Sequence, residues 1–237
     1  MSYFSYQPVQ PKSPHRRGPK KFKFYHVPKS GGTTIFNHIR NWNNVKRAHP
    51  NNNHVRIWQY PPAPGEIGLT ILRHPYSRFE SAFYHMVDSC NDNFYYRKAN
   101  ISDCEELKKL NIDFDIFQHN PNLFLYNLVT KSARYYKEAN KVYHHFSIFK
   151  PQFYWLSDFW RLNIHPGLKI FLNQENLTYE FNEFAKSIGQ NPPLNEWDGS
   201  DRVNKRISTQ NIPLTNISKD IIQKVYKDDF KHFKFNP

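Results

Sequence analysis

The sequence predicts one α/β domain with a central parallel sheet and helices on both faces. Two segments carry this prediction, because in each an apolar run ends at a short polar turn and apolar residues at helical spacing follow. A third unit of the same kind lies nearer the C-terminus. Alternating strands and helices favour parallel pairing, since each helix returns the chain to the starting end of the sheet. The length of 237 residues fits a single domain.

The first two units lie in the N-terminal half of the chain. Residues 21–27, KFKFYHV, are predicted to form a strand that ends at Pro28, and residues 33–42 to form a helix. Residues 67–72 form an apolar run typical of a strand buried in a parallel sheet. Pro75 follows, a residue that suits the first turn of a helix. Each unit therefore consists of a strand, a tight turn and a helix.

The C-terminal part continues this pattern. Residues 169–177 are predicted to form a third strand, and residues 179–188 the helix after it. An amphipathic repeat over residues 218–233 predicts a closing helix with Ser218 as its N-terminal cap. Residues 91–150 are expected to contain helices and loops, whose order the pattern does not define.

Residues 1–20 differ from the rest of the chain. They are rich in proline and basic residues and lack periodicity, so we expect a flexible arm before a domain that spans residues 21–237. The arm contains no apolar segment long enough for a signal peptide or a membrane anchor. We therefore expect a soluble cytoplasmic protein of bacterial or viral origin, unless an anchor was removed.

The net charge limits the classes of partner. The chain has 33 Lys and Arg against 20 Asp and Glu, and the formal charge of +13 predicts a surface that attracts anions. No zinc-finger spacing or RNA-binding motif accompanies the charge, so an anionic small molecule ranks above a nucleic acid. Cys90 and Cys104 are too few for a disulfide scaffold and wrongly spaced for a zinc site. A disulfide between them and two reduced thiols both fit the sequence.

The turn after the first strand contains candidate anion ligands. Gly31 and Gly32 allow the backbone to approach a ligand closely, Lys29 supplies a full charge, and the hydroxyl groups of Thr33 and Thr34 add donors. The helix that follows adds partial positive charge at its N-terminus. The Walker pattern of ATP-binding loops places its lysine after the glycines, whereas Lys29 precedes them. The turn therefore favours a phosphate ligand outside the ordinary P-loop kinases, with a plain tight turn as the alternative.

Two segments resemble motifs of a known family. HVPKSGGTTIF, residues 26–36, resembles the 5′-phosphosulfate-binding loop of sulfotransferases that use 3′-phosphoadenosine 5′-phosphosulfate (PAPS). ILRHPYSRFESAFYH, residues 71–85, resembles their 3′-phosphate-binding segment. The first motif is closer to the carbohydrate (Golgi-type) branch than to the cytosolic small-molecule branch, and weaker similarity extends over most of residues 22–233. The resemblance implies a P-loop-like fold and PAPS as the co-substrate, without a metal ion.

The resemblance also implies which residues bind the nucleotide. Arg73 lies at the carboxyl end of a predicted central strand, where α/β sheets bind ligands, and Ser81 follows two helical turns later. His74 replaces the aspartate that is usual in this motif, and Arg78 is either a second phosphate ligand or part of a structural salt bridge. A basic segment further along either closes over the nucleotide or is an exposed loop. The implied set is Lys29, Ser30, Gly31, Gly32, Thr33, Thr34, Arg73 and Ser81, with Lys205, Arg206 and Ser208 in the basic segment.

The implied reaction needs a general base. Sulfuryl transfer to an alcohol is an in-line displacement, and histidine suits the removal of the hydroxyl proton. His54 is predicted to be this base because its interval before Arg73 resembles that of the family's catalytic histidine; His49 is the alternative. Lys29 is predicted to stabilise the bridging oxygen that leaves with the nucleotide.

The acceptor is predicted to be a hydroxyl group of a carbohydrate, with acidic glycans among the candidates. Trp58 is an aromatic side chain suited to stacking on a sugar ring, and the resemblance alone implies Gln152 as an acceptor contact. The alternative function is a basic protein without catalytic activity that binds nucleotides or nucleic acids through its charge.

Overall fold

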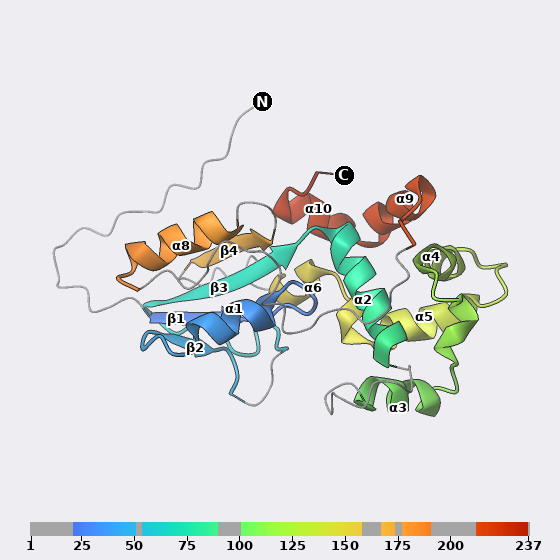
Figure 1. Ribbon diagram of the computed structural model, residues 1–237, viewed down its shortest axis with the longest axis horizontal. Helices are drawn as coiled ribbons and strands as arrows, with labels where there is room; N and C mark the ends of the chain where they lie inside the picture. The colour runs from blue at the N-terminus through green and yellow to red at the C-terminus, as the bar shows by residue number, and fades with distance from the viewer. Residues whose placement is uncertain are drawn as a thin grey trace.

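The computed structural model of the chain has a half that contains the sheet and a half built from helices (Figure 1). Within the described residues, four parallel strands form the sheet in the order β2–β1–β3–β4. Their bounds are β1 (Lys21–Tyr25), β2 (Val45–Arg47), β3 (Glu66–Arg73) and β4 (Leu168–Asn173). The structure describes residues 21–50, 54–89, 101–157, 167–173, 177–190 and 212–236.

Helices follow the strands as the sequence predicts: α1 follows β1, α2 follows β3 and α8 follows β4. The helical elements are α1 (Gly32–Ile39), α2 (Pro75–Ser89), α3 (Ile101–Lys109), α4 (Pro121–Val129), α5 (Tyr136–His145), α6 (Gln152–Leu156), α8 (Leu177–Ser187), α9 (Asn216–Val225) and α10 (Lys227–Phe233), with the 3₁₀ turns η1 (Phe114–Phe117) and η2 (Ser147–Phe149).

One face of the sheet packs against α1 and α8. Phe24 of β1 and Leu69 of β3 are in register, and Phe171 of β4 lies on the same face. These side chains form a buried cluster with Ile35 of α1 and Phe181 of α8. A layer of aromatic and branched side chains thus joins both helices to the strands.

The opposite face packs against α6 and α10. Leu72 of β3 belongs to a second buried cluster, with Trp155 and Leu156 of α6 and Phe233 of α10. Helices therefore cover both faces, and the predicted α/β fold with a parallel central sheet is confirmed.

The helical half has an aromatic core of its own. Phe79 and Phe83 of α2 pack on Phe124 of α4, and the Phe124 ring stacks on Phe149 of η2 at 5.3 Å between centroids. Because α2 starts where β3 ends and runs into this half (Figure 1), the core fixes the direction in which the chain leaves the sheet.

The closing helix differs from the prediction over residues 218–233. It is two helices, α9 and α10, because the backbone of Tyr226 leaves the helical region (φ −108°, ψ 27°). The Tyr226 ring is buried and its hydroxyl donates to the Phe149 carbonyl at 2.7 Å. Ser218 as the cap is wrong: the side chain of Thr215 accepts the Ser218 N–H at 3.2 Å.

Other segments refine the predicted boundaries. β2 was not predicted, since three residues are too few to show a period. The strand predicted over residues 169–177 ends at Asn173, and residues 174–176 lie outside the described part.

The predicted arm, residues 1–20, and Cys90 also lie outside the described part, while Cys104 forms no disulfide with a described residue. None of the helices in the described ranges is long and apolar enough to cross a bilayer.

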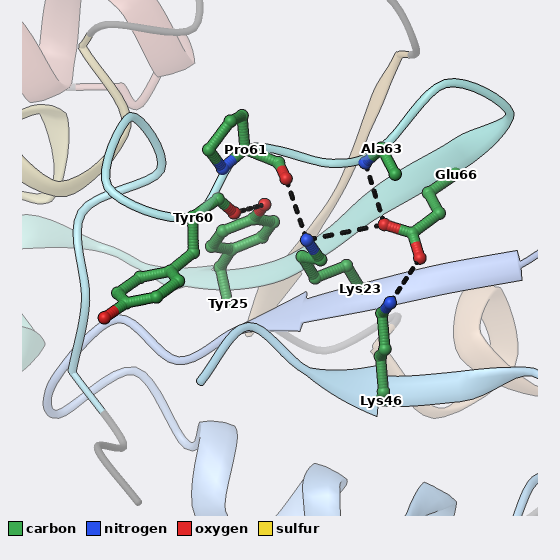
Figure 2. Close-up of polar contacts among 7 residues, drawn as sticks. All are labelled: Lys23, Tyr25, Lys46, Tyr60, Pro61, Ala63 and Glu66. Carbon is green, nitrogen blue, oxygen red and sulfur yellow. Dashed lines mark hydrogen bonds and ion pairs between the residues drawn. The ribbon is translucent and has the colours of Figure 1, made fainter. Parts of the chain in front are cut away.

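The segment between β2 and β3 is fixed to the sheet by side chains of β1 (Figure 2). The Tyr25 hydroxyl donates to the Tyr60 carbonyl at 2.6 Å, and Lys23 Nζ donates to the Pro61 carbonyl at 2.8 Å. Both bonds come from the face opposite α1. They hold the stretch of chain that leads from His54 back into β3.

Glu66, the first residue of β3, completes this attachment (Figure 2). Its carboxylate accepts the Ala63 N–H at 2.8 Å and forms ion pairs with Lys23 (3.4 Å) and Lys46 (2.6 Å). Burial alone would raise the pKa of Glu66, but the hydrogen bonds from Lys46 and Ala63 and the charge of Lys23 lower the pKa to about 2.

Glu66→Gln is expected to lower the free energy of unfolding at pH 7 by about 1–3 kcal/mol, because charge-assisted hydrogen bonds are lost at a buried site. The folded-state pKa lies below the unfolded value, so this stabilisation is present above pH ~4.5 and disappears as the pH falls through about 2. Urea titrations should therefore show a gap between wild type and variant that closes in acid. Glu183→Gln, which alters an exposed pair with Lys186, is the control; an unchanged stability of Glu66→Gln at pH 7 would contradict this account.

Candidate active site

The turn after β1 has an unusual backbone. Lys29 and Gly31 both have positive φ, 63° and 87°, a region that glycine adopts freely and lysine rarely. Gly31 is the N-cap residue of α1 and has no side chain with which to cap it, so the amides of the first turn are left for another acceptor. The positive end of the helix dipole lies at the same place. The turn therefore presents donors and positive potential together, as an anion site requires.

Lys29 and Arg73 act on each other electrostatically. Burial, and then the positive charge of Arg73, lower the pKa of Lys29 to about 8. Arg73 is the last residue of β3, and its Nε donates to Ser77 Oγ of α2 at 3.1 Å. In the strand order β2–β1–β3–β4, the chain goes from β1 to one edge of the sheet and from β3 to the other edge. Lys29 follows β1 and Arg73 ends β3, so both residues lie at the topological switch point between these strands.

One side-chain amide joins these two segments. Gln152 Oε1 accepts from Ser30 Oγ at 3.1 Å and from the Arg73 N–H at 2.8 Å, and Gln152 Nε2 donates to the Arg73 carbonyl at 2.8 Å. Ser30 and Gln152 are both completely buried. The turn after β1 and the end of β3 are thus within reach of a single side chain.

His54 belongs to the same electrostatic environment. Burial, and then the positive charges of Lys29 and Arg78, lower the pKa of His54 to about 4. The imidazole is therefore neutral at pH 7, as a general base must be. The alternative base, His49, packs its ring on Tyr60 at 4.7 Å between centroids.

His26, the residue after β1, links His54 to the start of α1. The two imidazole rings are 4.7 Å apart between centroids. A Cβ atom at Gly32 would overlap the His26 ring, so only glycine lets the first turn of α1 pack directly on it. The His26 ring therefore contacts both the first turn of α1 and the His54 ring.

The other predicted nucleotide ligands lie on α1 and α2. Ser81 follows Ser77 by four residues and so lies on the same face of α2 as the hydroxyl that binds Arg73. Thr33 and Thr34 belong to the first turn of α1. The predicted Lys205, Arg206 and Ser208 lie outside the described residues.

The structure shows contacts of Gln152 and Arg78 that the sequence analysis did not predict. The Gln152 side chain has no exposed surface, and with a bond from Nε2 to Asp229 Oδ2 at 3.5 Å all four of its hydrogen-bonding positions are used. A contact with an acceptor molecule would need one of these bonds to break. The buried guanidinium of Arg78 donates to the carbonyls of Pro28 (2.9 Å) and Ile148 (3.1 Å), and to no carboxylate of a described residue. Both side chains bind backbone groups beside the site.

Asp229 was missed by the sequence analysis. Its carboxylate is buried and accepts the backbone N–H groups of Gln152 (2.9 Å) and Phe153 (2.7 Å). A signal was present, since Asp229 lies three residues after Tyr226 and four before Phe233, both apolar-face residues of the predicted helix. A charged residue at such a position has a buried partner.

A comparison with protein-family models matches residues 17–236 to the sulfotransferase family. The chain belongs to this family. The match covers nearly the whole chain and confirms the PAPS-dependent sulfotransferase class that the two short motifs predicted. Searches of curated proteins and of solved structures found no match.

Sulfotransferases of this family generally take the sulfuryl group from PAPS. In the described ranges, no three His, Cys, Asp or Glu side chains gather as a metal ion would require.

Gly32→Ala in this sulfotransferase is expected to lower the free energy of unfolding by about 1–3 kcal/mol, because the added methyl group must displace the His26 ring in a packed region. Urea unfolding followed by circular dichroism measures the change. Gly167→Ala is a matched control, since a Cβ there meets open space. Equal stability of the two variants would mean that α1 does not pack on His26 as described.

Proposed function

We propose that this sulfotransferase transfers the sulfuryl group of PAPS to a hydroxyl group of a carbohydrate. Lys29 and the amides and hydroxyls of residues 30–34 bind the 5′-phosphosulfate, Arg73 and Ser81 bind the 3′-phosphate, and His54 is the general base. Residues Lys205, Arg206 and Ser208 contribute to the nucleotide site from the basic segment. The observation that carries the proposal is the Gln152 amide, which bonds to Ser30 and Arg73 at once.

The charges of the site support a ligand with two phosphates. Lys29 and Arg73 lie close enough for the charge of one to lower the pKa of the other. Bringing like charges together is unfavourable, and a ligand that places anionic groups beside both residues offsets this repulsion. A nucleotide that carries a phosphate at each end of its ribose meets this condition, with one phosphate beside Lys29 and the other beside Arg73.

The protonation states suit a displacement with a base. PAPS, when bound, supplies a sulfuryl group on a phosphate leaving group. His54 takes the proton from the acceptor hydroxyl while the new S–O bond forms and the bond to the phosphate oxygen breaks. Lys29 donates a hydrogen bond to that oxygen, which leaves with adenosine 3′,5′-bisphosphate (3′,5′-ADP). With pKa values of about 4 and about 8, His54 is neutral and Lys29 is mainly charged at pH 7.

The surface next to His54 supports a sugar acceptor. Trp58 is 46% exposed, and the Arg56 guanidinium lies 5.5 Å from its ring centroid and 4.5 Å from that of Tyr154. Flat aromatic faces suit stacking on a sugar ring, and the cation attracts acidic groups.

Binding of 3′,5′-ADP is expected to raise the melting temperature more than 5′-AMP or ATP with Mg²⁺ at equal concentration, because only this nucleotide reaches both cations. Lys29→Ala and Arg73→Ala should each weaken its affinity ~10–100-fold, the effect of losing a charge-assisted hydrogen bond. Isothermal titration calorimetry measures this loss, and Lys21→Ala, an exposed lysine at the start of β1, controls for net charge. Unchanged affinity in both site variants would remove the nucleotide assignment.

His54→Ala is expected to lower kcat by ~10²–10⁴-fold with little change in the affinity for 3′,5′-ADP. Transfer of labelled sulfate from PAPS to a panel of neutral and acidic polysaccharides provides the assay. His49→Ala tests the alternative base, and His119→Ala, on the exposed surface of the helical half, is the control. Full activity of His54→Ala would mean that another residue is the general base.

The pH dependence of kcat/KM should follow the two shifted groups of the free enzyme. Activity requires neutral His54 and charged Lys29, so it should fall below about pH 4 and above about pH 8. Bound phosphate groups favour the protonated forms, so both limbs of the kcat profile should lie at higher pH. Lys29→Arg should remove the alkaline limb, because arginine stays protonated; persistence of that limb would exclude Lys29 as its origin.

A further inference from the structure

We propose that Gln152 and Asp229 are positioning residues that set the spacing between the two phosphate-binding segments of the enzyme. This inference rests on the proposed function. It assigns no contact with the substrate to either residue, since both are buried.

The first observation is the geometry of the Gln152 amide. β1 stops pairing with β3 at Tyr25, opposite Thr70, so the last residues of β3 extend beyond it. There the Gln152 side chain bonds to both the N–H and the carbonyl of Arg73, as a neighbouring strand would. Its Oε1 also accepts the Ser30 hydroxyl. The amide thus fills the gap where the two strands separate and ties Arg73 to the turn that carries Lys29.

The second observation is that Gln152 is itself held from α10. It is the first residue of α6, and the Asp229 carboxylate accepts the N–H groups of Gln152 and Phe153, one on each oxygen. The helix break at Tyr226 turns α10 so that Asp229 reaches this point. A five-residue helix has little stability of its own, so these two bonds fix the place of the amide.

The third observation is that α6 also contacts the segment of the proposed base. The Trp155 carbonyl accepts the Ile57 N–H at 3.0 Å, and the Trp155 ring lies 6.1 Å from the His54 ring between centroids. One short helix therefore contacts the turn after β1, the end of β3 and the His54 segment. Its anchoring by Asp229 determines how the three are arranged, and the C-terminal helix acts on the site without touching a ligand.

The test compares two nucleotides that differ in one phosphate. Gln152→Met keeps the length of the side chain and removes its hydrogen bonds, and Asp229→Asn places an NH₂ group against one of the two N–H groups. If the link sets the spacing, the preference for 3′,5′-ADP over 5′-AMP, measured as a ratio of Kd values by calorimetry, should fall ~10-fold or more in Gln152→Met. The preference should also fall in Asp229→Asn. In both variants the affinity for 5′-AMP should change less than ~3-fold.

Controls separate positioning from folding. Gln223→Met removes another amide bond between elements, Gln223 Nε2 to the Tyr76 hydroxyl, and should leave the ratio unchanged. Melting temperatures show whether each variant is folded, and Asp229→Asn carries the test if Gln152→Met does not fold. An unchanged ratio, or an equal loss of affinity for both nucleotides, overturns the positioning role. A wild-type protein without preference for 3′,5′-ADP overturns the proposed function instead, and this inference with it.

Discussion

Two positive charges held close together are the constraint on which the site depends. Burial, and then the positive charge of Arg73, lower the pKa of Lys29. Bound phosphates convert this repulsion into attraction, but the unliganded protein must keep the charges in place by other means. It does so with buried hydrogen bonds to neutral groups: Gln152 binds Ser30 and the Arg73 backbone, and Arg78 binds the Pro28 carbonyl. Such bonds act at short range and fix the backbone that carries the two charged side chains.

The topology supplies the place for this arrangement. All strands of the described sheet are parallel. The chain leaves β1 toward β2 at one edge of the sheet and leaves β3 toward the other edge, and the two strands separate at this point. The gap brings the amides of α1 and the end of β3 to one edge of the sheet. On the far face, α6 and α10 pack against β3, so the residues that close the gap come from late in the chain. The site is therefore complete only when the C-terminal helices have docked.

The sequence was most informative where the predicted features lie within one contiguous segment of the chain. The turn from Lys29 to Thr34 and the Arg73 segment are contiguous, so spacing and residue type sufficed to predict the parallel strand before each and an anion ligand at the turn, while the phosphate at Arg73 came from the family resemblance. The break at Tyr226 and the role of Asp229 could not be predicted in the same way. They depend on partners 77 residues away, Phe149 and Gln152, and no local pattern contains such a pairing. Gln152 was predicted as an acceptor contact from the resemblance alone, and its bonds to Ser30 and Arg73 were not predicted, because a motif does not show which way a side chain points.

The central claim is that one nucleotide bridges the turn after β1 and the end of β3. A crystal structure of the protein with 3′,5′-ADP tests it most directly. We expect the 5′-phosphate to lie against the first amides of α1 and Lys29, the 3′-phosphate against Arg73, and the Gln152 bonds to remain intact. A complex in which Arg73 points away from the ligand, or in which the 5′-phosphate lies away from the start of α1, would contradict the account.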